Sequence, residues 1–287
     1  MNRMNVKRAT AGLALVAVCL VPGFAKGSQD SGRGDTGAQG AYTIEVAGST
    51  SVAPLMELLA KDYAAARIGE RKVTVNINGT GSSDGINAAA AGTTEVGMTS
   101  RELSPSEKGS GLTELVIAID GIAVIVNPAN PLGGISIAQC RDIYAGRIRD
   151  WSELTGDKQG PIAVVSREPG SGTRGAFEEI VGLKDALVPG SIEFDGTGAV
   201  KAEVSRNVDA IGYISLGSAD ASVKALEIEG TAASTANVIN GTYRIARPFI
   251  LLTRKGTLNP ETQRFLDWIM SAPGQGIVKR SWISVTG

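Results

Sequence analysis

The hydrophobic pattern of residues 43–98 switches between two periods. Apolar residues recur at every second position in short runs, which indicates strands, and near helical spacing in the longer runs between them. The predicted elements, in order, are strand 43–47, helix 54–66, strand 73–77, a helix through 86–90 and strand 96–98. A loop rich in glycine and hydroxyl residues follows each of the first two strands. This order is typical of an α/β sheet with a site at the carboxyl ends of its strands.

The second half of the chain contains one long apolar run. Leu115–Val126 is strongly apolar and β-branched, interrupted by Asp120 and Gly121, and Asn127 with Pro128 ends it. Such a run predicts a buried strand. The remaining predicted elements are helix 137–145, strand 162–165, helix 175–181, strand 210–214, strand 249–253 and helix 260–270, the last with Asn259 as its N-cap. We find no internal repeat of fixed period.

The amino-terminal residues are typical of an export signal. A basic start precedes the apolar stretch Ala9–Val21, which is too short to span a bilayer comfortably, and small residues permit cleavage after Ala25. The alternative is lipid attachment at Cys19, which would leave the chain anchored on the outer side of the membrane. Residues 1–25 are therefore predicted to be a signal peptide and 26–41 a glycine-rich, flexible tether. In either case we expect an exported, periplasmic or surface-anchored protein.

Composition excludes several classes of function. The chain has 287 residues, of which 43% are hydrophobic and 20% charged, so a globular core is expected. A net charge of −1 and an aromatic content of 5% argue against nucleic-acid binding. Histidine is absent, which excludes Ser-His-Asp catalysis and imidazole metal sites. Cys19 and Cys140 lack metal-ligand spacing, so we expect no metal and no cofactor.

Three short loops combine glycine with small hydroxyl residues: Gly48–Ser51, Gly79–Ser83 and Gly170–Arg174. Each runs toward a predicted helix, and N–H groups and hydroxyls at the positive end of a helix dipole bind anions. Such clusters are also ordinary turns and N-caps, so capping remains an open alternative for the first two loops, with Asp84 as a local cap. Three such loops together predict convergence on one small oxyanion.

The third loop also matches the pattern G-x-G-x-x-G at residues 170–175, which occurs in dinucleotide-binding folds. Here Arg167, Glu168 and Pro169 separate the strand from the first glycine, where that motif requires a tight turn directly. An exported protein also meets little NAD. The planar fork of Arg167 instead suits two oxygens of a tetrahedral anion, with residues 171–173 as helix N-terminal donors.

Asp120 lies inside an otherwise apolar strand. A buried carboxylate is unfavourable unless it is hydrogen-bonded or functional, and the sequence leaves both interpretations open.

Several segments together resemble the phosphate-binding proteins of bacterial ABC phosphate importers, the PstS family of type II periplasmic binding proteins. They are AGSTSVAPL at 47–55, GTGSSDGI at 79–86, GMTSREL at 97–103, AIDGIAVIVNP at 118–128, IAQCRDIYAGRIRDWSEL at 137–154, SREPGSGTRGAFE at 166–178 and AIGYISLG at 210–217. The resemblance implies an α/β fold of two lobes, each a mixed sheet flanked by helices, joined by two crossover strands. It places residues 42–126 and 247–287 in the first lobe and 127–246 in the second.

The same resemblance implies phosphate contacts at Ser49, Thr50, Ser51, Ser82, Arg167, Ser171, Gly172 and Thr173. To these predicted phosphate-binding residues we add Ser83, Ser100 and Asp120. One departure concerns the aspartate that accepts the phosphate proton in long-chain members, because Ser100 and Arg101 occupy its place here. Asp120 is the acceptor that we expect instead.

The resemblance also implies a non-enzymatic receptor for inorganic phosphate. Its expected partners are the membrane permease and ATPase subunits of an ABC importer, and the receptor itself is expected to be a monomer. One alternative is a receptor of the same fold for sulfate, molybdate or a phosphonate. Another is an exported serine hydrolase with a lysine base, although no Ser-x-x-Lys or Gly-x-Ser-x-Gly pattern accompanies Ser49, Ser82 or Ser171.

Overall fold

The computed structural model describes residues 40–67, 71–156, 160–183, 186–256 and 258–286. The predicted signal peptide, Cys19 and most of the predicted tether lie outside the described residues. Within these ranges, no helix is both long and apolar enough to cross a membrane.

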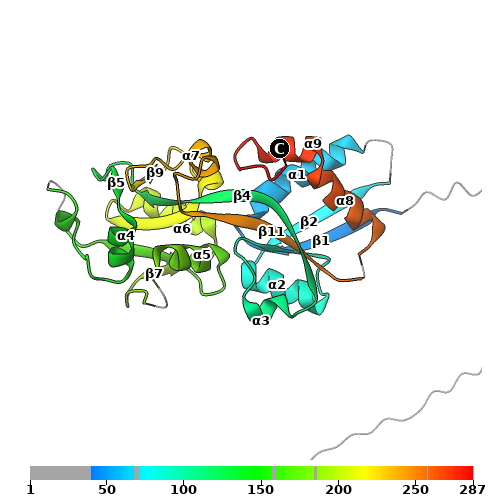
Figure 1. Ribbon diagram of the computed structural model, residues 1–287, viewed down its shortest axis with the longest axis horizontal. Helices are drawn as coiled ribbons and strands as arrows, with labels where there is room; N and C mark the ends of the chain where they lie inside the picture. Colours follow the sequence, from blue (N-terminus) through cyan, green and yellow to red (C-terminus); the bar gives the residue numbers. More distant parts are fainter. Residues whose placement is uncertain (1–39, 68–70, 157–159, 184–185, 257, 287) are drawn as a thin grey trace, which may run out of the picture. The chain divides into compact units, whose positions relative to one another are not determined.

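The first part of the chain alternates strands and helices as its hydrophobic pattern predicts (Figure 1). Its elements are β1 (Tyr42–Gly48), α1 (Ala53–Ala66), β2 (Val73–Gly79), α2 (Ser82–Ala91), β3 (Val96–Thr99) and α3 (Pro105–Lys108). β1 pairs in parallel with both β2 and β3, so the carboxyl ends of these strands meet at one edge of the sheet. The first two hydroxyl-rich loops leave from this edge.

Two long strands connect the two halves of the fold. β4 (Leu112–Val126) and β11 (Ala246–Arg254) pair antiparallel along most of their length (Figure 1). β11 also pairs with β3, while Ile122–Val126 of β4 pairs with β8 (Ala210–Ser215). The resulting sheet has the order β2-β1-β3-β11-β4-β8-β6-β7, with β9 paired to β4. Here β6 is Ala163–Arg167, β7 is Ile192–Phe194 and β9 is Lys224–Ala225. The two expected crossover strands are therefore β4 and β11.

The second lobe repeats the α/β arrangement around β8. Its main elements are α4 (Ile137–Tyr144), β6 (Ala163–Arg167), α5 (Gly172–Val181), β7 (Ile192–Phe194) and α6 (Thr197–Arg206). Its shorter elements are β5 (Gly134–Ile135), β9 (Lys224–Ala225), β10 (Glu227–Ile228) and α7 (Thr235–Ile239), with 3-10 turns at Trp151–Glu153 and Leu216–Ser218. β6 pairs in parallel with β7 and β8, whereas β4 is antiparallel to β8, so this part of the sheet is mixed as expected.

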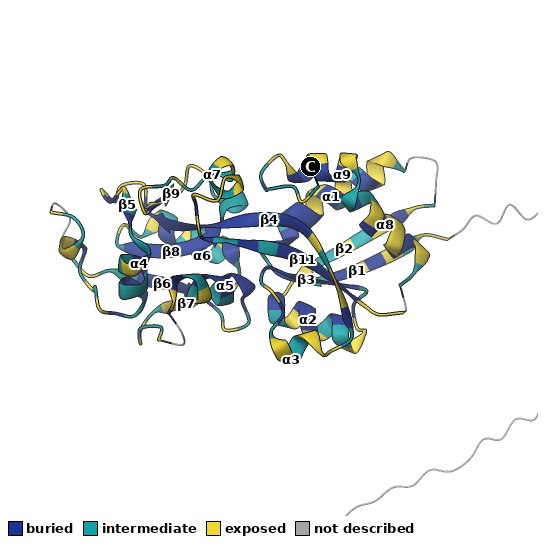
Figure 2. Cartoon of the chain, in the orientation of Figure 1, coloured by how far each residue is buried: buried dark blue, intermediate teal, exposed yellow. Residues whose placement is uncertain are grey.

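Each lobe has its own apolar core (Figure 2). The first core contains residues of α1, β1 and β3 together with Phe265 of α8 (Pro260–Met270) and Ile277 of α9 (Ala272–Val278). The second contains Tyr144, Trp151 and Phe177, all with side chains fully buried. Ile122, Val124 and Val126 also belong to this second core. The expected division of the chain at residue 126 remains a prediction, and the packing places the change of core within β4.

Several helices differ from the expectation. α5 begins at Gly172 rather than at residue 175, because the Ser171 hydroxyl accepts the Arg174 N–H and so starts the helix earlier. The helices α3, α6, α7 and α9 are not predicted at all. Only Val200 and Val204 of α6 are buried apolar residues, so its sequence carries a weak helical period.

Candidate anion-binding site

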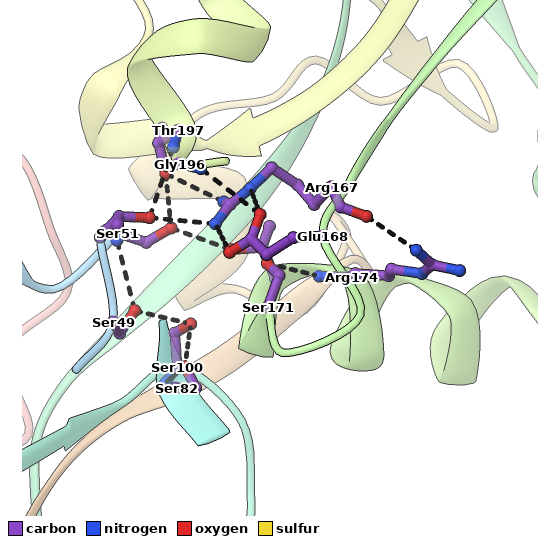
Figure 3. A network of polar contacts seen from close by, with 12 residues as sticks. Ser49, Ser51, Ser82, Ser100, Arg167, Glu168, Ser171, Arg174, Gly196 and Thr197 are labelled. Atoms are coloured by element: carbon purple, nitrogen blue, oxygen red, sulfur yellow. Dashed lines mark hydrogen bonds and ion pairs between the residues drawn. The ribbon is translucent and has the colours of Figure 1, made fainter. Parts of the chain in front are cut away.

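Loops from both lobes meet where strands of each lobe end (Figure 3). The first lobe contributes the segment after β1, the start of α2 and the residue after β3, and the second contributes the end of β6 and the starts of α5 and α6. Buried polar residues are concentrated here: Ser49, Ser51, Ser82, Ser100, Arg167, Ser171, Thr173 and Thr197. Such a group of buried hydroxyls around one arginine is stable only when its members have hydrogen-bond partners.

In the first lobe the hydroxyls form a chain. Ser49 Oγ donates to Ser100 Oγ at 2.9 Å, and Ser100 Oγ lies 3.3 Å from Ser82 Oγ. Ser49 Oγ also accepts the N–H groups of Ser51 and Val52 at 3.2 and 3.4 Å. Ser49 Oγ therefore orders the turn that leads into α1, whose N-cap is Val52 with no side-chain cap, while it donates its own hydrogen to Ser100.

Glycine permits the close packing behind this chain. Gly48 has φ +135°, and a Cβ added there would lie 2.2 Å from the carbonyl oxygen of Met98. Only a residue without a side chain can bring β1 and the start of α1 this close to β3. The predicted cap at Asp84 is wrong, because Gly81 is the N-cap of α2 and no side chain caps this helix.

Hydrogen bonds across the two lobes hold the loops together. Ser51 Oγ shares hydrogen bonds with Thr173 Oγ1 at 2.8 Å and with Thr197 Oγ1 at 2.9 Å. The Ser83 N–H donates to the carbonyl oxygen of Gly170 at 3.1 Å. Each hydroxyl-rich loop of the first lobe is thus bonded to a helix start in the second lobe.

Arg167 is 1% exposed and lies at the centre of this network (Figure 3). Its Nε and Nη2 donate to the two carboxylate oxygens of Glu168 at 2.7 and 2.6 Å. Its Nη2 also donates to Thr50 Oγ1 at 3.1 Å and its Nη1 to Thr197 Oγ1 at 3.3 Å. The guanidinium is therefore held rigidly. Its two Nη atoms bond to Thr50 of the first lobe and Thr197 of the second.

The start of α5 fits closely against the first lobe. A Cβ added at Gly172 would lie 2.3 Å from Ser82 Oγ and 2.8 Å from Ser100 Oγ. The N–H groups of Gly172 and Thr173 have no partner within the helix and can face an anion, whereas the Arg174 N–H already donates to Ser171 Oγ. Gly172 thus lets a helix N-terminus of one lobe approach two hydroxyls of the other.

Asp120 is 1% exposed and fully engaged by protein groups. Its Oδ2 accepts from Arg247 Nη2 at 3.1 Å and Nε at 3.3 Å, and its Oδ1 accepts from Ser215 Oγ at 2.8 Å. Burial raises the pKa of Asp120 to about 6, although Arg247 opposes this shift. Accepting a ligand proton would require one of these bonds to be exchanged. Its role as acceptor remains a prediction.

Arg101, the neighbour of Ser100, points toward α3. Its two Nη atoms donate to the Glu107 carboxylate at 2.7 and 2.8 Å, and its Nη2 donates to Ser83 Oγ at 3.3 Å. These hydrogen bonds lower the pKa of Glu107 to about 2. Arg101 therefore supports the second hydroxyl loop from outside.

Several residues that the site brings together are absent from the sequence-based set, among them Ser215, Thr197, Glu168 and Arg247. Thr197 follows Gly196 in a segment of the same glycine and hydroxyl composition as the predicted loops, which is a signal that could have found it. Glu168 is the sequence neighbour of Arg167, and Arg247 stands beside the apolar strand that was predicted from Phe249 onward. No comparable signal identifies the last two.

The described part of the chain contains no group of three or more His, Cys, Asp or Glu residues that could hold a metal ion. Cys140 is a free thiol buried in the second core.

Comparison with known proteins places these features in a family. Residues 33–273 match the model of the PBP superfamily domain. The chain is 38% identical to the phosphate-binding protein PstS 2 of Streptococcus agalactiae over 48% of this chain and 50% of that protein. It is 29% identical to the phosphate-binding protein PstS of Pseudomonas aeruginosa, over 96% of this chain and 93% of that one. The match therefore spans about half the length of the streptococcal relative.

The chain is also similar to solved structures of proteins described as phosphate receptors. One neighbour is described as a phosphate ABC transporter substrate-binding protein from Clostridium perfringens, with bound phosphate. It has a TM-score of 0.82 and 43% identity, covering 85% of this chain and 100% of that chain. Another, an ABC-type phosphate transport receptor from Vibrio cholerae, has a TM-score of 0.69 and 34% identity, covering 84% of this chain and 99% of that chain.

Proposed function

Since this chain belongs to the PBP superfamily, we propose that it is an exported receptor that captures inorganic phosphate between two lobes and delivers it to an ABC-type membrane permease. The observation that carries the proposal is the convergence of helix starts, hydroxyls and the buried Arg167 on one point between the lobes. The similarity to phosphate-binding proteins of known structure supports phosphate as the ligand.

The proposed ligand contacts are drawn from both lobes: Ser49, Thr50, Ser51, Ser82, Ser83, Ser100, Asp120, Arg167, Ser171, Gly172 and Thr173. Removing a phosphate dianion from water is unfavourable unless nearly all of its oxygens are hydrogen-bonded. Fixed N–H groups, hydroxyls and one guanidinium provide such bonds without a large positive charge. Micromolar affinity requires about 8 kcal/mol net. We propose that Ser51 exchanges its bonds to Thr173 and Thr197 for bonds to the ligand when phosphate enters.

The proposal concerns binding and not catalysis. The sequence has no histidine, and the hydroxyls of Ser49 and Ser82 bond to another hydroxyl or to N–H groups. None of the hydrogen bonds described for Ser49, Ser82 or Ser171 involves a lysine that could serve as a base. We further propose a monomer that works with permease and ATPase subunits, located outside the cytoplasmic membrane and anchored there if Cys19 carries a lipid.

Isothermal titration of ligand-stripped protein with phosphate and then sulfate, at neutral pH and fixed salt, tests the proposal. One-to-one saturable binding of phosphate with little response to sulfate is the expected result. If the protein does not bind phosphate but binds sulfate, molybdate or a phosphonate, it is a receptor for that other oxyanion. Turnover of a chromogenic ester would instead indicate the hydrolase.

A further inference from the structure

A second buried guanidinium lies beneath the hydroxyls of the proposed phosphate site. It belongs to Arg247 in β11, one of the two crossover strands, and none of the glycine-rich loops supplies it. We propose that Arg247, held in place by Asp120, is a positioning residue and the second cation of this site, which fixes the Ser100 hydroxyl as a donor toward the bound anion. This inference rests on the proposed function.

The ion pair is oriented with its positive end toward the site. Arg247 and Asp120 are register partners on β11 and β4, and the side chain of each is 1% exposed. The Nε and Nη2 atoms of Arg247 face Asp120, while Nη1 donates to Ser100 Oγ at 3.3 Å. The guanidinium therefore stands between the carboxylate and the hydroxyl chain, so an anion at the hydroxyls meets the cation first.

The pattern of hydrogen bonds gives the Ser100 hydroxyl a direction. Ser49 Oγ already accepts two N–H groups, so its own hydrogen goes to Ser100 Oγ. Ser100 Oγ then accepts from both Ser49 and Arg247, which occupies its two lone pairs and leaves its hydrogen to be donated. The Ser82 oxygen accepts the Ser100 N–H and lies 3.3 Å from Ser100 Oγ, so its second lone pair can take the Ser100 hydrogen until an anion does. An oxyanion would thus meet donors and not lone pairs, and Arg247 enforces this polarity.

Electrostatics links Arg247 to the other cation of the site. Burial lowers the pKa of Arg247 to about 10, and repulsion from Arg167 acts in the same direction. The two guanidinium groups are therefore close enough to destabilise each other. An anion bound between them relieves this repulsion. The two guanidinium groups therefore increase the affinity for the anion, in addition to ordering the hydroxyls of the site.

The test is a double variant that removes both charges but keeps hydrogen-bonding groups: Asp120→Asn with Arg247→Gln. We expect phosphate to bind about 10- to 100-fold more weakly, as for loss of a charge-assisted contact. We also expect a shallower dependence of Kd on salt concentration. The matched control is Arg67→Gln with Glu261→Gln, which neutralises a mostly buried pair of the first lobe that bonds at 2.8 Å. Arg67 is the C-cap of α1, at the end of that helix opposite the hydroxyl loop. The control should bind phosphate as the wild type does.

If circular dichroism shows that the double variant is unfolded, a double-mutant cycle provides the test instead. Arg247→Lys keeps the charge and loses the fork, and it should weaken phosphate binding in the wild-type background but much less in a Ser100→Ala background. If Arg247→Lys and Ser100→Ala have additive effects on affinity, the proposed role of Arg247 is wrong. The same holds if a folded double variant binds phosphate within threefold of the wild type. Neither result contradicts the proposed function. A wild type that binds neither phosphate nor sulfate would overturn the proposed function as well.

Discussion

At the scale of single residues, burial determines which side chains can act on an anion. Arg167 is 1% exposed, and its positive charge is balanced in the structure by the carboxylate of Glu168. A cation held this way is already desolvated and oriented, so little reorganisation accompanies ligand binding. Its removal leaves Glu168 without its cationic partner, and it also removes the proposed contact between Arg167 and the anion.

We expect Arg167→Ala to weaken phosphate binding by roughly 2–4 kcal/mol, because it deletes a charge-assisted contact and leaves an unpaired carboxylate in the site. Calorimetric titration measures the change. Arg206→Ala is the control, since that arginine pairs with Glu203 on the exposed side of α6. Affinity close to the wild-type value would remove Arg167 from the proposed site.

The second prediction at this scale concerns selectivity. Protonated phosphate can donate a hydrogen bond to a carboxylate, whereas sulfate only repels one. If Asp120 accepts that proton, Asp120→Asn reduces discrimination against sulfate more than it weakens phosphate binding, as paired titrations with the two anions would reveal. A parallel change for both anions would mean that Asp120 acts only through Arg247. Glu168 would then be the next carboxylate to substitute.

At the scale of elements, the approach of α5 to the first lobe depends on one missing side chain. Gly172→Ala would place a Cβ 2.3 Å from Ser82 Oγ, so the helix start or the serine must move. We expect phosphate affinity to fall at least about tenfold with little change in melting temperature, because the strain lies at the junction of the lobes and not in either core. Titration and calorimetric melting together measure this.

Gly198→Ala is the matched control for that substitution. Gly198 lies in the first turn of α6, and a Cβ added there meets nothing within 4 Å. Unchanged or slightly improved stability with normal affinity is expected for it. Equal loss of affinity in both variants would show that helix flexibility, and not contact with Ser82, determines binding.

The short helix α3 makes part of the stability dependent on pH. Hydrogen bonds from Arg101 lower the pKa of Glu107 in the folded protein to about 2, below its ordinary value of 4.5. A carboxyl with a depressed folded pKa stabilises the fold above its unfolded pKa, and this contribution is lost as the pH falls from about 4.5 to 2.

We therefore expect the free energy of unfolding of Glu107→Gln to fall less steeply with acid than that of the wild type between these two pKa values. Urea unfolding across the acid range measures the two slopes, and Glu57→Gln on the exposed side of α1 is the control. Identical slopes for wild type and Glu107→Gln would contradict this assignment.

At the scale of the whole molecule, the sequence predicts best those elements whose hydrophobic period is complete within one segment. The apolar runs predicted β1, α1, β4 and α8 because each run alone carries its period. The shared composition of three loops led to residues that the fold brings together, including Ser51 and Thr173, which lie 122 positions apart. Arg247 was missed because its partner Asp120 lies 127 positions away, and no local pattern encodes that pairing.

The reactivity of the buried Cys140 thiol can be used to measure how often the second lobe opens. Burial raises the pKa of this thiol, so a thiol reagent reacts only when the second core opens. In protein lacking residues 1–25, the labelling rate therefore measures opening of that lobe alone. We expect phosphate to slow labelling if closure around the anion stabilises both lobes together. A rate unchanged by saturating phosphate would mean that the second lobe opens independently, so that a receptor loaded with its ligand still has one half free to unfold and refold.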